Sequence, residues 1–304
     1  SYSVTGVQTC ALPISFSARL TATGDLNRPT ARLILDAKDV QTPQAGLSSA
    51  ALSFDVLPVA ELGPVFPGLG VRGGGEVTGL HGPGGPLFQG HAVVLAVDAG
   101  LSTDMDVAVR SLSVTAGGLA VAVQGDMPRT RPMQAACRIT LADLGELAAG
   151  LGLPLSGAFR ADATLAGQPD GQGLGLELSG GLTGLAAASG EPAAALIAHL
   201  MGPSPTFSAK ARVEGQRITV PELDLRGTNL RLTTEARADL TERTMASTTT
   251  LNMPDLNALS AVAGRPLRGE AGLVATLSGR LDSPDAAADI RLSGLRIGDM
   301  PAAS

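Results

Sequence analysis

The residues best able to do chemistry in this sequence are few and widely spaced. Gly68-Leu69-Gly70-Val71-Arg72-Gly73 has the G-x-G-x-x-G spacing of a dinucleotide-binding turn. Pro67 precedes it, a glycine run follows where a helix should begin, and no βαβ pattern surrounds it. We therefore interpret this stretch as a loop and expect no cofactor.

Histidine and cysteine, the usual ligands of transition metals, are also scarce. His81, His91 and His199 share no ligand spacing with one another or with Cys137. Together with Cys10, Cys137 is too little for a disulfide framework. We expect no metal site, an ordinary half-buried thiol at Cys137, and His199 on the polar edge of a helix.

Two pairs of acidic residues have the spacing of a general acid and base. Asp104 and Asp106, and likewise Glu222 and Asp224, are two residues apart, so on a strand each pair shares a face. Solvated strand faces carry such pairs equally well. The sequence has no G-x-S-x-G, P-loop or H-E-x-x-H motif. We therefore expect a solvated face at both pairs, and a protein that is not an enzyme.

Composition indicates many short strands around an unusual core. The chain has 304 residues, 44% of them hydrophobic, but no Trp, one Tyr and six Phe, so its apolar residues are mainly Ala, Leu and Val. Its 39 Gly and 20 Pro interrupt the chain every few residues. With 22 basic and 28 acidic residues the net charge is −6, and the charges are scattered. The absence of a basic stripe argues against nucleic-acid binding.

Alternation of apolar and polar residues, the period of a strand with one wet face, begins at Phe16. Gly24-x-Leu26-x-x-Pro29 then separates two alternating runs and predicts a hairpin. The same spacing returns as Gly279-x-Leu281-x-x-Pro284, at an offset of 279 − 24 = 255. The sequence therefore repeats a β unit.

A longer block also repeats, at an offset of 112. Residues 141–167 and 252–279 share nine matched positions without a gap, among them Asp143/Asp255 and Gly157/Gly269. Each block predicts a short helix, over 142–150 in the first, followed by a strand. A further helix is predicted over 191–201. Residues 63–90 predict a soft boundary of loops around a short strand at 76–80, and Arg217–Pro221 and Glu222–Leu225 predict two separate strands.

The two ends of the chain carry separate expectations. Residues 1–15 break the alternation and look like translated sequencing adapter, so we treat them as a non-native leader. Residues 16–304 are then expected to be a fragment of one continuous repetitive groove. No window of 18 or more apolar residues occurs in them.

Repetition of one β unit predicts a mainly β fold, elongated and solenoid-like, with a few short helices. An interior of Ala, Val and Leu either closes as a dry core or leaves an apolar groove, and sequence alone leaves both open. An open groove would present a long apolar strip, for which an acyl chain is the natural ligand.

The repeat motifs resemble a known family. G-x-L-x-x-P-x-A between strands, D-L-x-x-L…G-x-P-L-x-G before a strand, and the run from Phe207 to Gly227 resemble the TamB family of the AsmA-like superfamily. The resemblance covers residues 16–304 and is clearest over 133–304.

This resemblance implies a β-taco groove in the periplasm of a Gram-negative bacterium. It would be anchored in the inner membrane by an N-terminal region absent from this chain, and would reach an Omp85-type outer-membrane barrel, TamA. It would conduct phospholipid between the membranes and support outer-membrane protein assembly and secretion. We expect fifteen apolar residues to contact phospholipid acyl chains: Leu20, Leu33, Leu35, Leu52, Phe54, Leu95, Val97, Leu165, Leu176, Val213, Leu225, Leu232, Leu273, Leu277 and Ile290. The alternative is a secreted β-solenoid adhesin or passenger domain.

Overall fold

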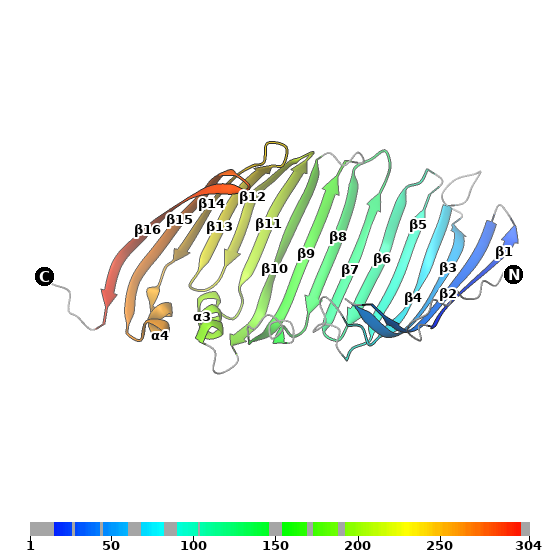
Figure 1. Cartoon of the computed structure of the whole chain (residues 1–304), viewed down its shortest axis with the longest axis horizontal. Coiled ribbons are helices and arrows are strands. Elements are labelled where there is room, and N and C mark those ends of the chain that lie inside the picture. Colours follow the sequence, from blue (N-terminus) through cyan, green and yellow to red (C-terminus); the bar gives the residue numbers. More distant parts are fainter. Residues whose placement is uncertain are drawn as a thin grey trace. The chain divides into compact units, whose positions relative to one another are not determined.

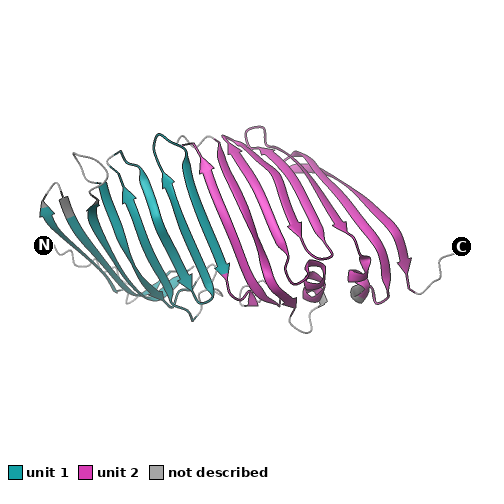
Figure 2. Cartoon of the chain, turned by 180° about the vertical axis from the view of Figure 1, so that it is seen from behind, with its two compact units in different colours: residues 1–140 teal, residues 141–304 magenta. Residues whose placement is uncertain are grey.

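The computed structural model describes residues 15–25, 28–42, 45–59, 68–81, 90–102, 104–145, 154–168, 173–187 and 192–298. The expected leader, apart from Ser15, and most of the helix expected over 142–150 lie outside these ranges. The chain divides into two compact units, residues 1–140 and residues 141–304 (Figure 2).

The described elements of unit 1 are strands. Its elements are β1 (Ser15–Asp25), β2 (Arg28–Gln41), β3 (Gly46–Val59), β4 (Gly68–Thr78), β5 (Val93–Leu101), β6 (Val107–Ala116), β7 (Leu119–Met127) and all but the last residue of β8 (Met133–Leu141). From β1 to β7, each strand pairs antiparallel with the next strand in the chain.

Unit 2 contains strands and short helices. Its elements are β9 (Leu155–Gly167), β10 (Leu174–Ala187), α3 (Pro192–Met201), β11 (Thr206–Glu214), β12 (Arg217–Arg226), β13 (Arg231–Asp239), β14 (Thr244–Met253), η1 (Leu256–Leu259), α4 (Ser260–Ala263), β15 (Leu267–Arg280) and β16 (Ser283–Ile297). Within each unit, the strands lie side by side in the order in which they follow one another in the chain (Figure 1). The prediction of a mainly β fold with a few short helices is confirmed, including the helix expected over 191–201.

The two matched hairpins have the same register. Gly24 pairs with Pro29 between β1 and β2, and Gly279 pairs with Pro284 between β15 and β16. Both glycines have a positive φ angle, 101° at Gly24 and 106° at Gly279, which residues other than glycine rarely adopt. The Gly and Pro of the repeated motif therefore occupy equivalent paired positions in the two hairpins.

The two blocks separated by 112 residues also share local geometry. Asp143 Oδ1 accepts a hydrogen bond of 2.8 Å from the Gly145 N–H, and Asp255 Oδ1 accepts one of 2.8 Å from the Asn257 N–H. Asp255 is the N-cap of η1. The strands that follow begin at Leu155 and Leu267, again 112 residues apart.

Two expectations about strand boundaries are wrong. Gly68–Gly73, interpreted as a loop, belongs to β4, which also contains the glycines that follow. A Cβ on Gly73 would lie 2.1 Å from the Ser53 carbonyl oxygen, so glycine here allows close approach to β3. The two strands expected over 217–225 are one strand, β12, because the register shifts between Val220 and Leu223 and a bulge accommodates Pro221.

Little of the described chain is buried in the usual sense. Ala116 in unit 1, and Leu141 and Ala161 in unit 2, are buried apolar side chains. The five others among the described residues also belong to unit 2 and comprise Leu185, Ala194, Met253, Leu256 and Ala258. These belong to α3, η1 and the strand ends near them (Figure 1). The middle of the sheet therefore has no comparable dry core among the described residues.

Candidate functional site

Register places the apolar side chains of unit 1 on one face of its strands. Paired residues in an antiparallel ladder point to the same side, and positions two apart on a strand share that side. One row runs Leu20, Leu33, Phe54, Gly73, Val97, Leu112 and Val123 across β1 to β7. A second runs Ala18, Leu35, Leu52, Gly75, Leu95, Val114 and Val121. We call this side the apolar face of unit 1.

Unit 2 has an apolar face of the same kind. Away from the strand ends, its members are Phe159, Ala161, Ala163 and Leu165 on β9; Leu174, Leu176, Leu178, Gly180 and Leu182 on β10; Phe207, Ala209, Ala211 and Val213 on β11; Ile218, Val220, Leu223 and Leu225 on β12; Leu232, Thr234, Ala236 and Ala238 on β13; Met245, Ser247, Thr249 and Leu251 on β14; Leu273, Ala275 and Leu277 on β15; and Ala286, Ala288, Ile290 and Leu292 on β16. Phe159 and Phe207 stack on this face with ring centroids 5.8 Å apart.

All fifteen residues expected to contact lipid lie on these two faces. Leu20, Leu33, Leu35, Leu52, Phe54, Leu95 and Val97 lie on the apolar face of unit 1, and Leu165, Leu176, Val213, Leu225, Leu232, Leu273, Leu277 and Ile290 on that of unit 2. None of them is buried, and Leu20 and Ile290 are 55% and 71% exposed. The described elements therefore leave these apolar rows without a covering layer.

The opposite face of unit 1, its polar face, carries an ordered row of charges. Arg32, Asp55, Arg72 and Asp98 occupy paired positions on β2 to β5, with alternating sign. Asp98 accepts from Arg72 Nη2 at 2.8 Å and from Arg110 Nε at 2.7 Å. Hydrogen bonds from Arg110 first, and then from Arg72, hold the pKa of the Asp98 carboxyl below its usual range.

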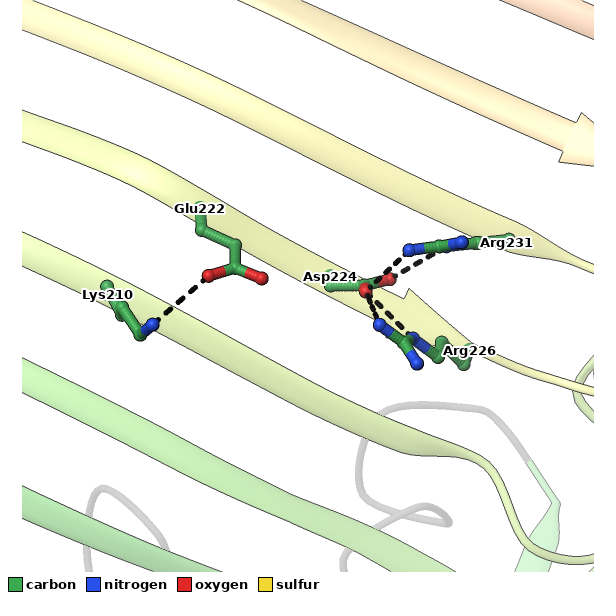
Figure 3. A network of polar contacts seen from close by, with 5 residues as sticks. All are labelled: Lys210, Glu222, Asp224, Arg226 and Arg231. Atoms are coloured by element: carbon green, nitrogen blue, oxygen red, sulfur yellow. Dashed lines mark hydrogen bonds and ion pairs between the residues drawn. The ribbon is translucent and has the colours of Figure 1, made fainter.

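The polar face of unit 2 contains a similar clamp at Asp224 (Figure 3). Asp224 Oδ2 accepts from Arg226 Nε at 2.8 Å and from Arg231 Nη2 at 3.0 Å. The hydrogen bonds, that from Arg226 foremost, outweigh desolvation and lower the pKa of Asp224. Asp224 is only 3% exposed, so the expectation of a solvated carboxylate here is wrong, because the two guanidinium groups cover it. Glu222, exposed, pairs instead with Lys210 at 3.3 Å.

Two turn carboxylates in unit 2 are held in a related way. Backbone N–H groups of Glu242 and then Thr241, with Arg217, lower the pKa of Asp239 at the end of β13. Arg280 lowers the pKa of Asp282 in the turn between β15 and β16. These contacts hold both carboxylates in place beside the turns.

A shallow hollow of about 500 Å³ lies across β12 to β15 of unit 2. Each strand lines it with three consecutive residues, 219–221, 235–237, 246–248 and 276–278. Because residues alternate sides, most of this lining belongs to the polar face, and Leu277 alone of the fifteen expected residues contributes. The middle residue of each triplet, Val220, Ala236, Ser247 and Leu277, belongs to one paired row of the apolar face, so the hollow borders that row.

The residues considered for metal chemistry do not converge. Within the ranges that the structure describes, no group of three or more His, Cys, Asp or Glu side chains could hold a metal ion. Cys137 is free and half-buried as predicted, and His199 is exposed on α3. Among the described helices, none combines the length and apolarity needed to cross a bilayer.

Sequence reasoning missed two features of these faces. The Asp98 clamp and the contact of Arg231 with Asp224 join residues on different strands, whose pairing depends on register, and charge spacing alone did not indicate them. Thr234 and Thr249 hydrogen-bond through their hydroxyls at 3.0 Å on the otherwise apolar face of unit 2. The signal for that pair was present, since both positions continue the alternation of Leu232 and Leu251.

Comparison of the chain with protein-family models, with curated proteins and with solved structures finds no match.

Proposed function

We propose that this chain is a periplasmic segment of a TamB-like protein that conducts phospholipid between the inner and outer membranes and supports outer-membrane protein assembly. The observation that carries the proposal is the continuous apolar face in each unit, whose side chains, apart from that of Ala161, are half-buried or exposed. Large exposed apolar patches on proteins usually mark binding sites. A long strip without charged groups suits acyl chains better than polar ligands.

The chemistry of the two faces supports a passive role. Apolar residues on one face offer area to acyl chains, at about 25 cal/mol per Å² of surface removed from water. The polar face, on the opposite side of the strands, carries ion pairs that interact with water. Anchoring to the inner membrane and docking onto an Omp85-type barrel such as TamA belong to the same proposal and rest on the resemblance of the repeat motifs.

Native mass spectrometry of the chain purified with lipid tests the proposal. Aspartate at Leu33, Leu52 and Val97 together, on the apolar face of unit 1, should abolish most bound phospholipid, because each charge must be desolvated against acyl chains. The matched control places aspartate at Thr21, Ala96 and Ala122, exposed positions on the polar face of the same unit. It should retain lipid.

Circular dichroism must show the same β signal in both variants. Unchanged phospholipid in the apolar-face variant, or no phospholipid in the unmodified chain, would overturn the proposal. A β-solenoid adhesin predicts the second of these results.

A further inference from the structure

Three hydroxyl side chains interrupt the apolar face of unit 2. Thr234 pairs with Thr249 across β13 and β14, and Ser247 lies two residues before Thr249 on the same strand. The remaining members of this face given above are Ala, Gly, Val, Leu, Ile, Met and Phe. The three hydroxyls are therefore contiguous, and we call them the hydroxyl cluster.

The hydroxyl cluster lies near the middle of its strands. Along β13 and β14 it has Leu232 and Leu251 on one side, and Ala238 and Met245 on the other. All three members are half-buried. Burying a hydroxyl among apolar side chains costs free energy unless the hydroxyl is hydrogen-bonded. This position therefore favours a hydrogen-bonding partner over contact with acyl chains alone.

Hydrogen-bonding capacity remains in the hydroxyl cluster. Each Thr or Ser hydroxyl has one donor and two acceptor positions. The 3.0 Å contact between Thr234 Oγ1 and Thr249 Oγ1 uses one of their two donors. One O–H group of the threonine pair and the O–H group of Ser247 can therefore still donate to an acceptor bound on the apolar face of unit 2.

A second threonine pair on the same two strands has different surroundings and serves as a comparison. Thr233 and Thr250 are paired on the same two strands, one residue away, and therefore lie on the polar face. There Asp224 is paired with Thr233, and Arg226 and Arg231 lie close by. Strand propensity accounts equally for both pairs, whereas a neutral, apolar surrounding is specific to Thr234 and Thr249.

We propose that the hydroxyl cluster binds the ester carbonyl oxygens of a diacyl lipid whose chains lie on the apolar face of unit 2; this inference rests on the proposed function. An ester carbonyl accepts hydrogen bonds without donating, which matches the free O–H groups. The apolar face of unit 2 as given above carries no charged side chain, so a neutral acceptor fits the cluster and a phosphate does not. Acyl chains would then extend over Leu232 and Leu251 or over Met245.

Photocrosslinking with two phosphatidylcholine probes locates the lipid on the chain. One probe carries a diazirine next to the ester and the other carries it at the end of an acyl chain. Crosslinks are mapped by peptide mass spectrometry. The ester-proximal probe should concentrate on residues 232–236 and 247–251, and the chain-end probe should spread along the apolar face.

The decisive variant is Thr234→Val with Thr249→Val, which keeps side-chain shape and strand propensity. Removing both partners avoids leaving one hydroxyl unpaired. We expect the ester-proximal concentration to fall about fivefold, the factor that one neutral hydrogen bond supplies, while total crosslinking persists. Ser247→Ala alone should lower it less. The matched control, Thr233→Val with Thr250→Val, should leave it unchanged.

The outcomes separate this inference from the proposed function. Crosslinks on the apolar face that ignore the hydroxyl cluster, or that are the same in the Thr234/Thr249 variant and the unmodified chain, overturn the inference alone. Crosslinks by neither probe to the apolar face overturn the proposed function as well. Circular dichroism of each variant must match that of the unmodified chain, and Ser247→Ala serves if the double variant does not fold.

Discussion

Units 1 and 2 both separate an apolar face from a charged one, but they differ in what breaks the pattern. In unit 1 the break is glycine, with Gly73 and Gly75 standing in the two apolar rows of β4. In unit 2 a glycine also occurs, Gly180 on β10, but the pattern is broken in addition by the hydroxyl cluster on β13 and β14. Glycine removes side-chain area without adding polarity. Hydroxyls keep the area and add hydrogen-bonding groups.

The two units also differ in how deeply their clamped carboxylates lie. Asp98 and Asp224 each accept hydrogen bonds from two arginines on the polar face. The Asp98 side chain is 21% exposed and that of Asp224 only 3%. The Arg226 and Arg231 side chains that contact Asp224 are themselves more than half exposed. A carboxylate held by two arginines is therefore partly exposed to water in unit 1, at Asp98, and is a covered clamp in unit 2, at Asp224.

The largest predicted effect tests the role of glycine in unit 1. In Gly73→Ala the new Cβ would meet the Ser53 oxygen at 2.1 Å and the Phe54 Cα at 2.7 Å, both backbone atoms that cannot rotate away. Strands β3 and β4 would have to separate, at a cost of about 3 kcal/mol. Thermal unfolding followed by circular dichroism should show a lower midpoint.

Gly272→Ala on β15 is the control for Gly73→Ala. A Cβ at Gly272 would find no atom within 4 Å, so its midpoint should stay within about 1 °C or rise slightly. Equal midpoints for the two variants would show that close approach is not what glycine provides in β4.

The second prediction concerns the covered clamp of unit 2. Asp224→Asn should destabilise the chain by about 1 kcal/mol at pH 7, a value discounted for the exposure of both arginines. Arginine pairing lowers the pKa of the folded-state Asp224 carboxyl below the unfolded value near 3.9. Its contribution is therefore present above about pH 4 and is lost as the pH falls through the folded-state pKa. Urea unfolding at pH 7 and at pH 2.5 measures both limits.

Asp289→Asn is the control for Asp224→Asn. Asp289 is an exposed carboxylate on the polar face at β16. Its replacement should change the unfolding free energy little at either pH. An Asp224→Asn deficit that is the same at pH 7 and pH 2.5 would mean that the carboxylate charge is not the source of the stability.

Alternation in the sequence was sufficient to predict the apolar faces. The period of two assigns Leu33 and Leu35, or Leu273 and Leu277, to one side of a strand whatever the strand pairs with. Joining the strands into rows required register, which the sequence does not state. The hairpin motif at Gly279 is an exception, because its turn length fixes the pairing of β15 with β16.

The strand position of Gly73 in β4 and the environment of the clamped Asp224 could not be predicted from the sequence pattern, for the same physical reason. Gly73 is a loop signal when read locally, and only the nearness of β3 makes it a strand residue. Asp224 looks solvated when read locally, and only pairing of β12 with β13 brings Arg231 to it. Both misreadings arise where a neighbouring strand decides a residue's environment and the local sequence does not.

The smallest predicted effect compares the two clamps directly. Asp98→Asn should lower the unfolding midpoint at pH 7 by less than Asp224→Asn does, because water screens the more exposed Asp98 clamp. Raising the salt from 0.1 M to 1 M shortens the Debye length from about 10 Å to about 3 Å. The Asp98 effect should then largely vanish while most of the Asp224 effect remains. Thermal unfolding of both variants at the two salt concentrations measures this difference. Equal salt sensitivity would mean that Arg226 and Arg231 do not shield Asp224 any better than Arg72 and Arg110 shield Asp98.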